Sequence, residues 1–337
     1  MQYLIGTDEA GYGPNLGPLV IAGSLWRVPA GVGAADLYTR LAPTVAAQAS
    51  SQPAGKPALV IADSKRVYQS GGSLAGLERG VFAALGALGR GPRSWTAVWQ
   101  ALAPDHLAAM RGEPWCAGFD PPLPRDLDAA AADQAEATLA AAQQSAGVAL
   151  IELACRVVWP GEFNDLLDRC GSKGALLSKL TLQLAGRLLA VAEEGAAAVA
   201  SPARSGAPLA PAEVVCDKHG GRNRYAGLLA EAFDAGLVET HKEGRDESAY
   251  TATFGGRRTV FRFCVRAESR LPVALASMAA KYLRELAMAA WNAYWRERVP
   301  GLQPTAGYPA DAQRFRREIA AAQSQLGLSD RQLWRQR

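Results

Sequence analysis

The chain begins with two apolar segments that are separated by a glycine-rich turn. Residues 3–7 have the pattern of a short strand, and residues 19–28 have that of its neighbour. The turn between them, residues 11–18, holds three glycines and two prolines. Further strands are predicted at 58–62, 94–102, 148–159 and 213–217.

Helical spacing follows these strands. Five leucines recur one, three or four positions apart and predict a helix that faces the core: Leu176, Leu177, Leu180, Leu184 and Leu188. Other helices are predicted at 74–88, 126–146, 272–295 and 314–326. Residues 251–254 and 259–265 flank Gly255-Gly256 and indicate a hairpin. Strands that later alternate with helices indicate an α/β fold with a mixed β-sheet.

The length of 337 residues suits one large domain with insertions. Weak patterning or a high turn content marks 30–57 and 104–146 as insertions and 201–211 as a linker. Residues 300–337 form a C-terminal helical part that we expect to bind substrate.

Charge and cysteine content narrow the class of protein. Charged residues interrupt the longest apolar region, 176–200, and the chain starts directly with a strand, so neither a membrane partner nor a secretory signal is predicted. Five cysteines without a CxxC pair argue against zinc and suit a reduced, cytoplasmic protein. The net charge of +4 permits a nucleic-acid partner without requiring one.

Three acidic residues follow predicted strands. Asp8 and Glu9 come after the first strand, where the turn can direct both side chains to one site, and Asp217 ends a later strand. Carboxylates are ligands for hard cations such as Mg²⁺ or Mn²⁺. The glycine-rich turn could instead cradle phosphate, but it lacks the Gly-Lys-Ser/Thr ending of a P-loop, and the two acids before it would repel phosphate unless a metal lay between them.

The segment DEAGYGPNLGPLVIA, residues 8–22, resembles the opening signature of the type 2 ribonucleases H, ribonucleases HII and HIII. Other segments resemble that family's motifs in the same order. They are Ala62-Asp63-Ser64-Lys65, Phe163-Asn164, Val214-Val215-Cys216-Asp217, the segment 266–272 with the helix after it, and Gly307-Tyr308-Pro309. Together the matches cover about half of the chain.

The resemblance implies a ribonuclease H-like fold, a mixed sheet flanked by helices, and a metal-dependent endoribonuclease that uses two Mg²⁺ or Mn²⁺ ions about 4 Å apart. Its substrate would be RNA–DNA hybrids or ribonucleotides embedded in DNA, cut to give 3′-hydroxyl and 5′-phosphate ends. The implied metal ligands and catalytic residues are Asp8, Glu9, Asp217 and Glu268. The implied substrate-binding residues are Gly11, Tyr12 and Gly13 at the ribose 2′-hydroxyl, Ser64 and Lys65 near phosphates, and Tyr308 at the sugar.

The chain departs from the family at two positions. The fourth acid is Glu268 where aspartate is usual, and Tyr12 stands where ribonuclease HII has arginine. Asp246 and Glu247 are rival acids outside the matching segment. Two alternatives therefore stay open: a DNA nuclease or resolvase of the same fold, and a catalytically impaired descendant that binds nucleic acid or a protein.

Several other residues have a structural and a functional interpretation. His219 is expected to be a solvated turn residue, with proton transfer as the alternative. Trp291 and Trp295 are expected in the core at helical spacing, although tryptophan can also stack on bases. The C-terminal arginines could form a surface that binds a phosphate backbone: Arg314, Arg316, Arg317, Arg331, Arg335 and Arg337.

Overall fold

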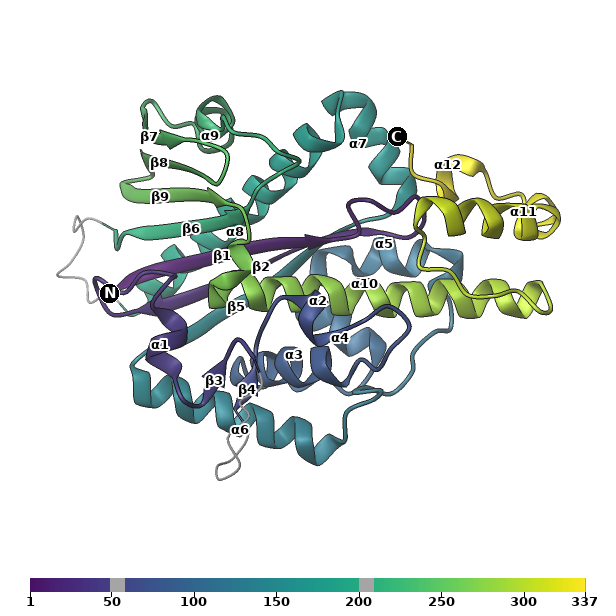
Figure 1. Ribbon diagram of the computed structural model, residues 1–337, viewed down its shortest axis with the longest axis horizontal. Helices are drawn as coiled ribbons and strands as arrows, with labels where there is room; N and C mark the ends of the chain where they lie inside the picture. Colours follow the sequence, from purple (N-terminus) through teal and green to yellow (C-terminus); the bar gives the residue numbers. More distant parts are fainter. Residues whose placement is uncertain (49–57, 200–208, 337) are drawn as a thin grey trace.

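A seven-stranded mixed sheet forms the centre of the protein, with strand order β5-β2-β1-β6-β9-β8-β7 (Figure 1). The computed structural model describes residues 1–48, 58–199 and 209–336. The strands of this sheet are β1 (Gln2–Ala10), β2 (Leu19–Val28), β5 (Ala149–Val158), β6 (Ala212–Asp217), β7 (Val238–Glu243), β8 (Glu247–Phe254) and β9 (Arg257–Cys264). The predicted α/β fold with a mixed sheet is confirmed.

Strand direction matters for the site. β1, β6 and β9 are neighbours and run parallel, whereas the outer pairs on either side are antiparallel. Parallel strands bring their carboxyl ends to the same edge of a sheet. Residues that end or directly follow β1, β6 and β9 therefore meet there, although they are about two hundred residues apart in sequence.

Helices cover both faces of the sheet (Figure 1). On one face the long helix α10 (Leu271–Arg298) packs across β1 and β2, and on the other face α8 (Lys173–Val199) does so. With α10 lie α1 (Leu37–Leu41), α2 (Ser64–Val67), α3 (Ala75–Ala87), α4 (Trp95–Leu102), α5 (Leu107–Gly112), α6 (Ala129–Ala146), α11 (Pro309–Gln325) and α12 (Asp330–Leu333). With α8 lie α7 (Pro160–Cys170) and α9 (Ala226–Phe233).

Gly6 of β1 determines how closely α10 approaches the sheet. A Cβ at this position would lie 2.2 Å from the carbonyl carbon of Pro272 and 2.3 Å from the nitrogen of Val273. Because both atoms belong to the backbone of α10, no side-chain movement could relieve the clash. Glycine therefore lets the first turn of α10 sit directly on the central strand.

Most predicted elements are confirmed, and one is wrong. Residues 94–102 form helix α4 and not a strand. Ser94 caps this helix by accepting a hydrogen bond from the nitrogen of Ala97 at 3.4 Å, and its buried residues, Trp95, Val98, Trp99 and Leu102, recur at helical spacing. The aromatic and β-branched content favoured a strand, but the period of burial is that of a helix.

One predicted strand is shorter than expected, and some segments contain helices or strands that were not predicted. The strand predicted at 58–62 is β4 (Leu59–Val60), which pairs with β3 (Val45–Ala46) in a separate two-stranded sheet. Helices α7 and α9 and strand β7 were not predicted. Residues 49–57 of the first predicted insertion and most of the predicted linker lie outside the described residues.

The segment 104–146 contributes to the core. It contains the short 3-10 helices η1 (Pro104–His106) and η2 (Pro114–Cys116) besides α5 and α6. Trp115 of this segment packs with its ring centroid 4.5 Å from that of Trp291 in α10. Trp291 and Trp295 are 1% and 0% exposed, which confirms the expectation that they are core residues.

Within the described residues, one helical stretch is long and apolar enough to cross a membrane. It runs from Lys173 to Glu194 in α8, and 61% of its apolar window is buried inside the protein. This burial is that of a helix packed on a sheet, because its leucines form the apolar cluster on that face.

Candidate functional site

The predicted acids meet at the edge of the sheet where β1, β6 and β9 end. Thr7 of β1 lies opposite Cys216 of β6, so Asp8 and Asp217 follow at neighbouring positions. Asp217 in turn lies opposite Cys264, the last residue of β9. Glu268 follows β9 in the short 3-10 helix η4 (Ala267–Ser269). The topology therefore gathers residues from three parts of the chain.

The Asp217 carboxylate also shapes the loop that carries Glu268. Its Oδ1 accepts a hydrogen bond from the backbone nitrogen of Ala267 at 3.3 Å. Arg266, just before, has a left-handed backbone with φ 57°, which is uncommon for a residue with a side chain and turns the chain sharply after β9. The hydrogen bond and the sharp turn together hold Glu268 beside Asp217.

Electrostatic interactions link Asp8, Glu9 and Asp217, and Glu268 acts on Asp8 and Asp217. Burial raises the pKa of Asp8 to about 7, with a further rise from the charges of Asp217 and Glu268. Burial raises the pKa of Glu9 to about 8, and Asp8 and Asp217 raise it further. The pKa of Asp217 is raised by burial and by Glu268. Because like charges repel, ionisation of one of these carboxyl groups makes ionisation of its neighbours less favourable.

We expected a turn after the first strand to direct Asp8 and Glu9 to one site, but the chain does not bend at these two residues. Strand β1 continues to Ala10, and both residues are in regular register with β2, Asp8 opposite Ala22 and Glu9 opposite Ile21. Neighbours in a strand point to opposite faces. Asp8 lies on the α10 side, where the neighbouring Ser277 side chain lowers its pKa. Glu9 interacts electrostatically with Tyr12 and Lys65.

Ser64 and Lys65 lie at the border of this acid cluster. Ser64 is 7% exposed, and its Oγ accepts a hydrogen bond from the Oγ of Ser277 at 3.1 Å. Lys65 is exposed, and its charge lowers the pKa of both Glu9 and Asp217. Lys65 is therefore a cation at the mouth of the site.

Ser277 is a site residue for which the sequence analysis assigned no role. It contacts both Asp8 and Ser64 from α10. Ser277 could have been noticed in the sequence, because it stands in the helix that directly follows the segment of Glu268. Nothing in its own pattern distinguishes it from a core serine, so only packing identifies it.

The glycine-rich turn, residues 11–18, runs past the acids towards α10. Gly11 has φ 90°, and a Cβ there would lie 2.5 Å from Nε of Arg284, so both backbone conformation and space require glycine. Gly13 is exposed with nothing within 4 Å of the corresponding position, so a ligand can reach its main chain. Tyr12 is half-buried between them.

Tyr308 lies beside this turn. The carbonyl of Gly307 accepts hydrogen bonds from the nitrogens of Asn15 at 2.7 Å and of Leu16 at 3.3 Å. The Tyr308 side chain is 51% exposed, an unusual value for a large apolar residue in this protein. The structure thus joins the turn and Tyr308, which are about three hundred residues apart in sequence.

Two expectations about other residues are corrected. His219 is not a solvated turn residue: it is 2% exposed, lies beside the rings of Tyr225 and Phe263, and burial lowers its pKa to about 3. In the turn after β6, the backbone nitrogen of His219 donates a hydrogen bond to the Tyr225 hydroxyl at 3.2 Å. The rival acid Glu247 is engaged by Arg262 at 2.9 Å and Lys242 at 3.2 Å.

Most of the C-terminal arginines are paired or buried, while Arg317 is exposed on α11. Arg314 pairs with Asp311 and Glu318, Arg316 with Asp330, and Arg331 with Asp165 and Asp168. Arg335 is buried, and Arg337 lies outside the described residues. Each paired arginine has its charge offset by a carboxylate, so these residues add little positive potential for a phosphate backbone.

The acids suit a divalent cation by donor type and by charge. All four offer hard oxygen ligands, and a cation would offset the repulsion that contributes to the raised pKa values of Asp8, Glu9 and Asp217. Among the described residues, however, no three His, Cys, Asp or Glu side chains converge closely enough to form a ready-made metal site. The carboxylates would therefore have to turn towards an ion as it binds.

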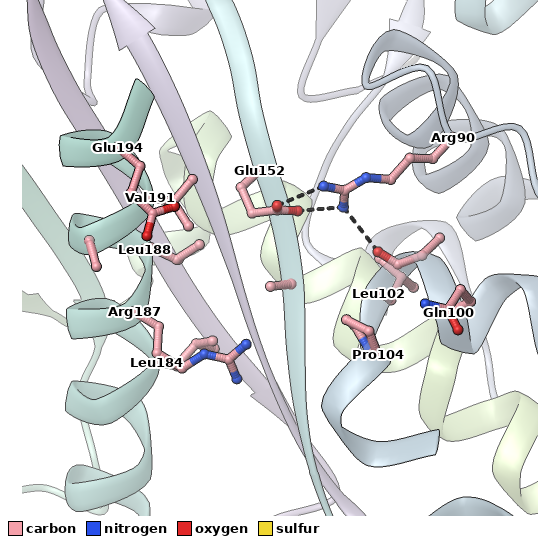
Figure 2. Close-up of a pocket in the computed structure, with 13 residues that line it drawn as sticks. Arg90, Gln100, Leu102, Pro104, Glu152, Leu184, Arg187, Leu188, Val191 and Glu194 are labelled. Carbon is pink, nitrogen blue, oxygen red and sulfur yellow. Dashed lines mark hydrogen bonds and ion pairs between the residues drawn. The ribbon is translucent and has the colours of Figure 1, made fainter. Parts of the chain in front are cut away.

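A separate cavity lies away from the acids. It has a volume of about 470 Å³ and lies between α8 and the edge strand β5 (Figure 2). Its charged groups are largely paired, since Arg90 contacts Glu152 through both nitrogens at 2.5 and 2.7 Å and donates to the carbonyl of Ala101 at 3.0 Å. The cavity contains none of the predicted site residues.

Comparison with known proteins gives structural relatives only. No protein-family model and no curated protein matches the sequence. A ribonuclease HII structure from Archaeoglobus fulgidus, solved with PCNA, aligns over 99% of this chain and 94% of its own at 14% identity and a TM-score of 0.41. Ribonuclease H2 from Pyrococcus horikoshii OT3 aligns over 98% and 92% at 14% identity and a TM-score of 0.45.

Bst-RNase HIII in complex with Mn²⁺ aligns over 99% of this chain and 66% of its own, at 17% identity and a TM-score of 0.36. The identities and TM-scores are low in every case. These three structures are of a ribonuclease HII, a ribonuclease H2 and a ribonuclease HIII, and each alignment spans nearly the full length of this chain.

Proposed function

We propose that the protein is a metal-dependent endoribonuclease that hydrolyses the RNA strand of RNA–DNA hybrids or ribonucleotides embedded in DNA. The observation that carries this proposal is the meeting of Asp8, Glu9, Asp217 and Glu268 at one sheet edge, beside a glycine-rich turn with an accessible main chain. The products would be 3′-hydroxyl and 5′-phosphate ends.

In this proposal the four acids hold Mg²⁺ or Mn²⁺, with two ions during catalysis. When bound, such ions supply an activated water and stabilise the leaving oxygen. The Ser277 side chain lies beside the Asp8 carboxylate, and the Ala267 nitrogen holds the Asp217 carboxylate through its hydrogen bond. These contacts leave the other carboxylate oxygens available to an ion.

Substrate selection rests on the turn and on Tyr308. The exposed main chain at Gly13 is suited to hydrogen-bond a ribose 2′-hydroxyl, the group that distinguishes RNA from DNA. Tyr308 offers a half-exposed ring against the sugar, and Lys65 offers a positive charge to a nearby phosphate. These features favour an RNA-containing duplex over plain DNA.

A second candidate is a catalytically impaired descendant that binds the same nucleic acid. It is favoured by Glu268 in place of aspartate and by the lack of a ready-made metal site among the described residues. An extra methylene displaces a carboxylate by more than about 1 Å, and displacements of this size can cost about a hundredfold in rate.

One assay separates these functions. The purified protein is incubated with Mg²⁺ or Mn²⁺ and three labelled duplexes: an RNA–DNA hybrid, DNA with one ribonucleotide, and plain DNA. We expect cleavage of the hybrid or of the ribonucleotide-containing duplex. Cleavage of plain DNA alone would identify a DNA nuclease, and binding without any cleavage would identify the impaired descendant.

A further inference from the structure

Arg335, near the C-terminus, is a buried cation to which no carboxylate among the described residues is paired. Its side chain is 0% exposed, and none of the described residues accepts a hydrogen bond from its Nε, Nη1 or Nη2. Burial, together with the charge of Arg284, lowers the pKa of Arg335 to about 9. A buried charge without hydrogen bonds is costly, so an arginine in this state needs an explanation.

The backbone around Arg335 is firmly held. Its nitrogen donates to the carbonyl of Asn15 at 2.8 Å, which ties it to the glycine-rich turn. Asn164 of α7 clamps the same segment, donating to the carbonyls of Arg331 at 3.0 Å and Trp334 at 2.9 Å and accepting from the nitrogen of Gln336 at 2.8 Å. Figure 1 shows the C-terminus returning to this place beside α7. The burial of Arg335 is therefore built into the fold.

A second buried arginine lies under the same turn. Arg284 is 1% exposed, its Nε has no acceptor among the described residues, and Gly11 lies directly against it. Its Nη2 donates to the carbonyl of Ala306 at 3.0 Å, and the charge of Tyr308 acts on its pKa. Glu285, at 3.6 Å from Nη1, is shared with Lys281 at 2.6 Å. Two cations thus lie under the turn, and among the described residues little negative charge lies close to them.

Packing does not account for Arg335. Its guanidinium lies 5.0 Å from the centre of the Phe163 ring. A cation–π contact offsets only part of the cost of burying a charge that has no hydrogen-bond acceptor. Methionine would fill similar space without that cost. The repulsion between Arg335 and Arg284 adds to the cost.

We propose that Arg335 and Arg284 give the turn of residues 11–18 a buried positive charge that holds a nucleic-acid phosphate against it. This inference rests on the proposed function, because it deepens how that same site binds its substrate. Tyr12 supplies no cation to the turn, and the acids next to it repel phosphate. In a dry environment a charge acts with little screening, so both arginines attract a phosphate across the turn without touching it. They are positioning residues.

The test compares Arg335→Met, Arg335→Lys and, as a matched control, Arg317→Met on the exposed face of α11. Thermal unfolding is measured without nucleic acid. The dissociation constant of an RNA–DNA hybrid duplex is measured in Ca²⁺ across a range of salt concentrations. We expect Arg335→Met to unfold at the same or a higher temperature, because it removes a buried unpaired charge.

We also expect Arg335→Met to bind the hybrid about tenfold more weakly, with a slope of log Kd against log salt that is smaller by about 0.7 to 0.9. Arg335→Lys and Arg317→Met should keep most of the affinity and of the slope. An Arg335→Met protein that is less stable but binds with an unchanged slope would show a purely structural arginine and overturn the proposal.

A second measurement does not depend on the folding of any variant. In the unchanged protein, one uncharged methylphosphonate linkage is moved along the hybrid, and one position should weaken binding about tenfold. Binding that is insensitive to every position overturns the proposal. Binding without cleavage contradicts the proposed function but not this inference, whereas cleavage with an unchanged salt slope in Arg335→Met contradicts only the inference.

Discussion

At the scale of single residues, the acids of the site differ in how the fold treats their charge. Asp8, Glu9 and Glu268 are all half-buried, but Asp8 and Glu9 lie in a strand and have raised pKa values, whereas Glu268 lies on a short loop. The first two are held by a central strand, and Glu268 is held by a turn that the Asp217 carboxylate stabilises. Substitution of each therefore tests a different part of the proposal.

Asp8→Asn keeps the shape of the side chain and removes its charge. We expect cleavage of the hybrid to fall at least about 100-fold, because charge stabilisation at a reaction centre is worth that much or more. Hybrid binding should be unchanged or slightly stronger, since one acid that repels phosphate is gone. The matched control is Asp133→Asn, whose carboxylate pairs with Arg93 on the surface at 2.7 Å. Full activity of Asp8→Asn would refute its role.

Glu268→Gln tests the least usual member of the set. Glutamine has the same length, so it separates loss of charge from displacement. We expect at least about a 100-fold fall in cleavage rate if Glu268 is a metal ligand. Steady-state cleavage is compared with that of Glu239→Gln, an exposed residue of β7. Equal rates for the two variants would exclude Glu268 from the catalytic set.

At the scale of elements, the fit of α10 on the central strand positions the site. This helix carries Ser277, which contacts Asp8, and Arg284, which lies under the glycine-rich turn. Its first turn lies on Gly6, two residues before Asp8. A change at that contact should therefore disturb both stability and the geometry of the acids.

Gly6→Ala introduces a Cβ into the backbone of α10. We expect it to destabilise folding by about 3 kcal/mol, because neither the strand nor the helix backbone can move aside cheaply. Denaturant unfolding measures the change. The control is Gly227→Ala in α9, where nothing lies within 4 Å of the added atom and alanine favours the helix. If both variants unfold at the same denaturant concentration, the close approach at Gly6 is unimportant.

At the scale of the whole molecule, one buried acid outside the site affects how stability varies with pH. Burial raises the pKa of Glu113, between α5 and η2, from 4.5 to about 7. A raised carboxyl pKa means that the folded state binds a proton that the unfolded state has already lost. Glu113 therefore costs no stability below about pH 4.5, and its cost grows as the pH rises to about 7.

Glu113→Gln removes this dependence. We expect the variant to match the unchanged protein near pH 4.5 and to unfold a few degrees higher at pH 7, as measured by calorimetry at a series of pH values. The difference between the two proteins cancels the titration of every other group. A difference that is constant with pH, or that favours the unchanged protein at pH 7, would contradict the buried, ionisable state of Glu113.

Sequence patterns by themselves determined the elements and the candidate acids. Strands near the start, the leucine-spaced helix and the Gly255-Gly256 hairpin depend on local spacing, and they formed where the pattern placed them. The prediction gave the wrong type of element in α4, where aromatic and β-branched residues recur at helical spacing. Asp8, Glu9 and Asp217 could be proposed because they follow or end predicted strands, whereas Glu268 was proposed only from the resemblance to the type 2 ribonucleases H.

Only the tertiary structure decided which residues meet. The parallel arrangement of β1, β6 and β9 brings Asp8, Asp217 and Glu268 to one edge, and strand order is not encoded in any local pattern. The burial of His219 and of Arg335 depends on contacts with distant segments, so both look solvated in the sequence. A side chain's charge and surroundings depend on the packing around it, which short-range periodicity does not contain.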